Sequence, residues 1–122
     1  MQPVEAVLLG AGQRGRDTYG GFALRNPHLI RFVAVADPDE GRRRAFAADH
    51  AIPPARQFRT WEELLAQPQM APLCVNTTMD RTHLPSSLAA MQSGYHLLLE
   101  KPMADTPHNP QADHPLVAAA AE

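Results

Sequence analysis

Short apolar segments alternate with amphipathic ones from Val4 to Leu99. Runs of Val, Leu, Ile and Phe of this kind are typical of strands buried on both faces of a parallel sheet. The expected strands are Val4–Leu9, Ile30–Ala36, Arg56–Phe58, Leu73–Asn76 and Tyr95–Leu99. Strands that alternate with helices at this spacing form βαβ units with right-handed crossovers. The pattern therefore predicts an α/β domain with a doubly wound parallel sheet of about five strands.

Two of the expected helices begin with a capping sequence. Asp37 is placed to be the N-cap residue of one of them, with Pro38 at its first position and Glu40 able to close a capping box. Thr60 and Glu63 repeat this arrangement at the start of a short helix. These signals place a helix after the second strand and another after the third.

The other two helices are predicted from spacing. Arg14–Leu24 has helical spacing and ends before Asn26-Pro27, because the residue before a proline disfavours the αR conformation. A later helix is expected from Pro85, with Gly94 at its C′ position. Three apolar residues then lie on one face of that helix: Leu84, Leu88 and Met91.

The tail has a different composition. Residues 103–115 are rich in proline and are expected to form an irregular loop, and residues 116–122 resume helical composition as the start of a terminal helix. His108 and His114, with two nearby aspartates, lack metal-ligand spacing, so no metal site is predicted. Residues 1–122 are expected to form one domain, because a second full domain does not fit in a chain of this length.

Composition narrows the class of partner. The chain has 122 residues, a hydrophobic fraction of 44% and a net charge of −2, which describes one globular domain. Nothing in this charge balance favours binding to nucleic acid or to an anionic membrane, so small molecules or other proteins are the expected partners. Cys74 is the single cysteine and is expected to be a buried, inert thiol. With no signal peptide in MQPVEAVLLGAG, residence in the cytoplasm is expected.

The loop after the first strand carries the strongest chemical signal. Gly10-Ala11-Gly12-Gln13-Arg14-Gly15 matches G-x-G-x-x-G between a predicted strand and a predicted helix, which is the context that the motif requires. Gly10 permits the tight turn, Gly12 lets a pyrophosphate approach the backbone, and Gly15 lets helix and strand pack closely. The loop predicts dinucleotide binding, whereas a glycine-rich turn without a ligand is the plainer alternative.

Asp37 follows the second strand, some twenty residues beyond the loop, where a carboxylate binds the adenosine ribose in such folds. N-capping alone is the other interpretation, and both roles can coexist because a carboxylate has several acceptor sites. The negative charge would repel a 2′-phosphate, which favours NAD. The run Arg42-Arg43-Arg44 keeps NADP as the alternative cofactor, since one arginine could turn to a phosphate.

Taken together, these residues resemble one family. LGAGQRG, VAVADPDEGRRRAFA, the two threonines after the fourth strand and HLLLEKPMA are similar to the N-terminal domain of the Gfo/Idh/MocA oxidoreductases, the glucose-fructose oxidoreductase and inositol dehydrogenase group. The resemblance extends from about Val4 to Asp105. E-K-P after the fifth strand is its most specific part. It implies a Rossmann domain of an NAD(P)-dependent oxidoreductase that acts on CH–OH groups.

The resemblance also implies which residues hold the cofactor. Asp37 would bind the adenosine ribose, and the residues matching the family's pyrophosphate loop are Gly10, Gly12, Gln13, Arg14 and Gly15. Thr77 and Thr78 match the family's Thr-Pro after the fourth strand, which lines the path to the nicotinamide, with threonine here in place of the proline. His83 matches a histidine at the start of the next helix, where a cofactor contact and a purely local hydrogen bond are both open.

Glu100 and Lys101 match the E-K of the E-K-P motif. The resemblance implies that the lysine is catalytic, lies near the reacting carbon and positions or polarises the substrate hydroxyl. Its ammonium is chemically suited to this, because positive charge stabilises the alkoxide that develops when a carbinol loses hydride. By position alone, the residue would be a surface lysine at a strand end.

Family members continue into a sixth strand and a second α/β domain, which supplies the substrate pocket and the oligomer interface. Neither is found in this sequence. One interpretation is that the chain is the N-terminal part of a dehydrogenase for a sugar, polyol or related hydroxy compound. A small-molecule substrate is then expected only when the second domain is supplied, and a homo-oligomer is a further possibility. The other is a truncated, catalytically inactive dinucleotide-binding module that acts through a partner chain.

Overall fold

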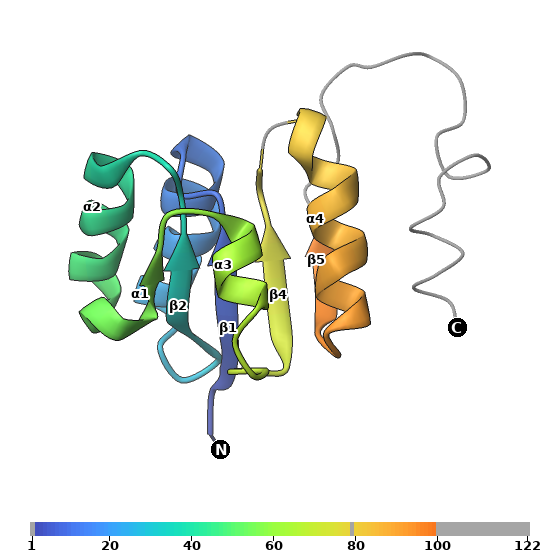
Figure 1. The fold of residues 1–122 in the computed structure, drawn as a ribbon. Helices are drawn as coiled ribbons and strands as arrows, with labels where there is room; N and C mark the ends of the chain where they lie inside the picture. Colours follow the sequence, from blue (N-terminus) through green and yellow to red (C-terminus); the bar gives the residue numbers. More distant parts are fainter. Residues whose placement is uncertain (1, 79, 100–122) are drawn as a thin grey trace, which may run out of the picture.

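The computed structural model describes residues 2–78 and 80–99 (Figure 1). Its strands form one parallel sheet in the order β3-β2-β1-β4-β5. The strands are β1 Val4–Leu9, β2 Ile30–Ala36, β3 Gln57–Phe58, β4 Leu73–Asn76 and β5 His96–Leu99. The predicted strands are therefore confirmed, although the third and the fifth each begin one residue later than expected.

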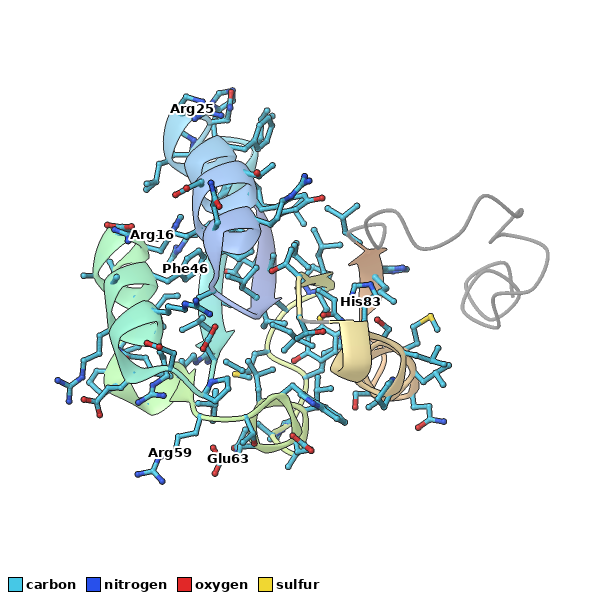
Figure 2. The ribbon with its side chains drawn as sticks, turned by 90° about the horizontal axis from the view of Figure 1, so that it is seen from above. Arg16, Arg25, Phe46, Arg59, Glu63 and His83 are labelled. Atoms are coloured by element: carbon cyan, nitrogen blue, oxygen red, sulfur yellow. The ribbon has the colours of Figure 1, made fainter. Side chains whose placement is uncertain are left out.

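Helices cover both faces of this sheet. They are the π-helical segment η1 Arg14–Gly20, α1 Gly21–Arg25, α2 Glu40–His50, the short 3₁₀ turn η2 Pro54–Arg56, α3 Trp61–Leu65 and α4 Asp80–Gln92. Seen from above, η1, α1 and α2 lie on one side of the strands, and α3 and α4 on the other (Figure 2). This arrangement confirms the doubly wound α/β fold.

Each face has its own hydrophobic core. On the side of η1 and α2, Leu8 and Phe32 pack with Phe46, and on the side of α3 and α4, Val7 and Leu9 pack with Leu64. All of these side chains are at most 1% exposed. Burial on both faces explains why the strands are apolar without alternation.

β2 contains one residue more than its ladder with β1 requires. Ala6 is paired with Phe32 and Val7 with Ala34, so Val33 is the extra residue of a β-bulge. As a result, Phe32 and Val35 both face η1 and α2 although they are three residues apart. Ala34 packs on the opposite face.

Two helix starts differ from the predictions. α2 begins at Glu40, and its N-cap residue is Asp39, whose carboxylate accepts a hydrogen bond from the Arg42 N–H at 2.9 Å. Asp37 is therefore not the N-cap residue, because its carboxylate is bonded elsewhere. α4 begins at Asp80, and Pro85 lies inside it. Pro85 is the sixth residue of α4, beyond its first turn, so the helix lacks one N–H donor at that position.

Two further helix signals are confirmed, whereas the predicted apolar face of α4 is not, since Leu84 is 37% exposed. The Thr60 hydroxyl accepts from the Glu63 N–H at 3.1 Å and caps α3. Gly94 follows α4 with φ +98°, as a C′ glycine does. Among the described residues, no helix is long and apolar enough to cross a membrane. The predicted loop 103–115, the predicted helix 116–122 and the histidines at 108 and 114 lie outside the described residues.

Cys74 is fully buried in β4, and burial raises the pKa of its thiol to about 12. We expect it to be unmodified by Ellman's reagent at pH 8 in the folded chain and to react fully in urea. Because the thiol pKa is higher in the folded state than its ordinary value of 9.0, this group stabilises the fold below pH 9 and loses that contribution as the pH rises toward 12. Rapid labelling without denaturant would contradict this assignment.

Candidate functional site

The carboxyl ends of β1 and β4 lie side by side at the point where the strand order of the sheet reverses. From β1 the chain proceeds to β2 on one side, whereas β4 and β5 lie on the other side. In open α/β sheets, ligands bind outside the carboxyl ends of the strands at such a switch point. Figure 2 looks onto this edge of the sheet.

The glycine loop turns sharply at the end of β1. Gly10 has φ +88°, a conformation that costs little only for glycine, and its N–H donates to the Ala36 carbonyl at 2.8 Å. A Cβ atom on Gly10 would also lie 2.8 Å from the Thr77 carbonyl oxygen. The turn is thus held between the ends of β2 and β4.

Gly15 and Gly12 differ in what surrounds them. A Cβ on Gly15 would collide with the carbonyl oxygen of Gly10 and lie 2.7 Å from Thr77 Oγ1, so Gly15 is required for the helix to pack under the loop. Around Gly12 the nearest atom is a guanidinium nitrogen of Arg42, at 3.8 Å. The space that a Cβ on Gly12 would fill is open to a ligand.

Asp37 is 6% exposed and is bonded to the glycine loop. Its Oδ2 accepts from the Ala11 N–H at 2.7 Å, and its Oδ1 accepts from the Asp39 N–H at 2.7 Å. The structure thus places the Asp37 carboxylate directly beside the glycine loop. Each oxygen retains acceptor capacity for a further donor.

A pocket of about 350 Å³ opens between the glycine loop and the start of α2. Its polar lining consists of Gln13, Arg16, Asp17, Asp39 and Arg42, with Gly12 and Gly41. Arg16 also contacts Asp49 at 3.2 Å, which links η1 to α2. Arg14, at the start of η1, is exposed and does not line this pocket.

The three consecutive arginines of α2 have different surroundings. Arg42 lines the pocket beside Gly12. Arg43 donates to the Asp37 carbonyl at 2.8 Å, and Arg44 lies 3.7 Å from Glu40. Arg42 is therefore the arginine placed to meet a phosphate in the pocket.

The loop after β4 is tied to the glycine loop. Thr77 Oγ1 donates to the Gly10 carbonyl at 2.6 Å, and the Thr77 N–H donates to the Leu9 carbonyl at 2.9 Å. Thr78 bonds instead to Asn76, to which its N–H and its hydroxyl both donate. Thr77 thus belongs with the glycine loop, whereas Thr78 belongs with the region between β4 and α4.

His83 is 6% exposed and lies within α4, across the sheet from Arg16 (Figure 2). Its main-chain carbonyl accepts from the Ser86 hydroxyl at 3.1 Å. Glu100 and Lys101 lie outside the described residues. The structure therefore brings together the glycine loop, Asp37 and Thr77, and places His83 on the α4 side.

Asn76 was not predicted as a site residue. It is fully buried and connects Thr78 to α4 through its side-chain amide. The available signal was a polar residue that ends an apolar strand beside two threonines, a pattern too common to single it out.

The fold, the glycine loop and the carboxylate bonded to it define a dinucleotide-binding Rossmann domain. A family profile described as an oxidoreductase family with an NAD-binding Rossmann fold, Gfo/Idh/MocA, matches residues 4–122. The chain belongs to this family, as its motifs predicted. No curated protein sequence gives a significant match.

Solved structures of dehydrogenases share the fold. An inositol dehydrogenase homolog from Azotobacter vinelandii, complexed with NAD⁺, is 25% identical over 98% of this chain and 32% of its own, with a TM-score of 0.71. UDP-N-acetylglucosamine 3-dehydrogenase from Acidithiobacillus ferrooxidans is 25% identical over 99% of this chain and 36% of its own, with a TM-score of 0.70. The 3-ketoreductase KijD10 from Actinomadura kijaniata, complexed with NADP, is 21% identical over 98% and 35%, with a TM-score of 0.77. The chain spans about a third of the length of these proteins.

Proposed function

We propose that this chain is the cofactor-binding part of an NAD(P)-dependent dehydrogenase that acts on the CH–OH group of a sugar, polyol or related hydroxy compound. The observation that carries the proposal is the hydrogen bond between Asp37 and the Ala11 N–H, which sets an acidic acceptor directly beside the open space at Gly12. A dinucleotide needs both features together, an approach for its pyrophosphate and an acceptor for its ribose hydroxyls. The names of the matched dehydrogenases support the substrate class.

The roles proposed for individual residues combine this geometry with the family resemblance. The residues that would hold the pyrophosphate are Gly10, Gly12, Gln13, Arg14 and Gly15. Asp37 would bind the adenosine ribose, and Thr77 and Thr78 the nicotinamide half. His83 and Glu100 are proposed as further cofactor contacts on the family resemblance. The nicotinamide, when bound, supplies the acceptor for hydride. Lys101 would place an ammonium near the substrate hydroxyl and favour loss of its proton.

NAD is expected to bind about tenfold more tightly than NADP, a difference of roughly 1.4 kcal/mol. The Asp37 carboxylate, beside the loop, would lie near a 2′-phosphate and repel it, and Arg42 would offset part of this repulsion. Isothermal titration calorimetry of the chain with each dinucleotide measures the two dissociation constants. In the Arg42→Ala variant we expect the affinity for NADP to fall more than the affinity for NAD, because the guanidinium lies beside the pyrophosphate space at Gly12 and would also meet a 2′-phosphate. The exposed Arg44→Ala variant is the matched control.

Two results would contradict these assignments in different ways. A folded chain that binds neither dinucleotide would remove the proposed function itself. Tighter binding of NADP than of NAD would leave the function standing and would show that Arg42 outweighs Asp37.

A further inference from the structure

Asn76 ends β4 with a side chain that is fully buried. Its Nδ2 group donates to Ser86 Oγ at 2.8 Å and to Ser87 Oγ at 2.7 Å, both in α4. Its Oδ1 accepts from the N–H and from the hydroxyl of Thr78, at 3.0 and 2.7 Å. The amide thus uses both of its hydrogens and both lone-pair positions of its oxygen.

The helix face that meets this amide is polar. Ser86 and Ser87 are 0% exposed, whereas Leu84, on the face that the apolar spacing singles out, is 37% exposed. Burying hydroxyl groups is unfavourable unless they are hydrogen-bonded, and here Asn76 supplies the partners. A fully satisfied polar network in a buried site fixes geometry more narrowly than apolar contact does.

The same amide fixes the loop at the switch point. Thr78 is held to Asn76 at two atoms, and Thr77 is held to the Gly10 carbonyl at 2.6 Å. The two threonines are therefore anchored on opposite sides, one to α4 through Asn76 and one to the glycine loop. The adenosine side of the site, at Asp37, has no part in the Asn76 network among the described residues.

We propose that Asn76 is a positioning residue for the nicotinamide half of the dinucleotide. By holding Thr78 to α4, it keeps the loop of Thr77 and Thr78 in the conformation that receives this half, while the glycine loop and Asp37 receive the adenosine half. The proposal rests on the function proposed above. It assigns the positioning of the nicotinamide half to Asn76, which is not among the residues that the family motifs indicated.

The test compares NAD with ADP, which lacks the nicotinamide half. In the triple variant Asn76→Leu, Ser86→Ala, Ser87→Ala, the network is replaced by apolar groups together, a change that leaves few buried polar atoms unpaired. We expect NAD affinity to fall about tenfold, the effect of one lost positioning hydrogen bond, and ADP affinity to stay within about twofold. Calorimetry gives both dissociation constants.

Cys74→Ala is the matched control. Cys74 is equally buried, and it lies two residues earlier in β4 on the same face of the sheet. This variant is expected to lose stability through a cavity while keeping the ratio of NAD to ADP affinity. If the triple variant does not fold, Ser87→Ala replaces it. This change removes one acceptor of the Asn76 Nδ2 group, and we expect a loss of about threefold in NAD affinity and none in ADP affinity.

A second readout needs no ligand. The Thr78 amide hydrogen is bonded to Asn76 Oδ1, so its exchange with solvent deuterium is expected to accelerate in the triple variant and not in Cys74→Ala. Equal losses of NAD and ADP affinity, unchanged NAD affinity, or unchanged Thr78 exchange would each overturn the proposal. If the unaltered chain binds neither ADP nor NAD, the proposed function falls first and this proposal with it.

Discussion

Replacing Gly15 by alanine is expected to lower the free energy of unfolding by about 3 kcal/mol, at the upper end of the range for overpacking a rigid site. The added methyl group would collide with the Gly10 carbonyl oxygen and crowd Thr77 Oγ1, two atoms that are hydrogen-bonded to each other at 2.6 Å. The loop must shift to admit it, so dinucleotide binding by the folded fraction is expected to be lost. Urea unfolding measures the first effect and calorimetry the second.

Gly12→Ala is the matched control for this prediction. Its methyl group would meet no atom closer than 3.8 Å, and that atom is on the flexible Arg42 side chain. We therefore expect the free energy of unfolding to change by no more than about 0.5 kcal/mol and dinucleotide binding to be lost, because the methyl group takes the space needed by the pyrophosphate. If Gly12→Ala bound NAD normally, the cofactor would not approach this loop as proposed.

Replacing Asp37 by alanine is expected to weaken NAD binding about a hundredfold, the effect of losing two hydrogen bonds to a charged acceptor. The same change removes the acceptor for the Ala11 N–H, a buried group, and should cost about 2 kcal/mol of stability. NADP affinity should fall less than NAD affinity, since repulsion of the 2′-phosphate disappears as well. Dissociation constants and urea midpoints of the same preparations separate the two effects.

Glu40→Gln is the control for charge near the start of α2. The Glu40 side chain is 63% exposed, and its ion-pair contacts with Arg43 and Arg44 are longer than 3.5 Å. We expect this variant to bind NAD as the unaltered chain does. A similar loss of affinity in Glu40→Gln and Asp37→Ala would mean that Asp37 acts only through net charge.

The strands could be predicted because burial on both faces leaves a plain mark on the sequence. The segments that form β1 and β4 contain almost no polar residue, and a short apolar run of this kind is typical of a strand buried on both faces. The glycine loop could be predicted for a similar reason, since Gly10 and Gly15 each meet a backbone or side-chain atom that excludes a Cβ. Local constraints of this kind are present in the motif itself.

Other features depend on contacts that a single segment does not reveal. Asp37 and Asp39 are both acceptable N-cap residues. Asp39 caps α2, whereas the Asp37 carboxylate accepts from the Ala11 N–H of the glycine loop and from the Asp39 N–H. In α4 the apolar spacing indicates Leu84, whereas the buried face contains Ser86 and Ser87, because Asn76 satisfies their hydroxyls. Polar partners far apart in the chain outweighed local pattern in both cases.

The bulge at Val33 determines on which face of the sheet the Asp37 side chain lies. In a strand of uninterrupted alternation, seven residues from Ile30 to Ala36 would direct the next side chain, Asp37, toward α3 rather than toward the glycine loop. With Val33 absorbed in the bulge, Asp37 points to the loop. A chain lacking Val33 would direct its aspartate the same way through a regular ladder, whereas one residue inserted after Val35 would turn it to the opposite face. A strand with this bulge and a regular strand one residue shorter therefore direct the acid to the same place. The acid is better located by the face of the strand on which it lies than by the number of residues that separate it from the glycine loop.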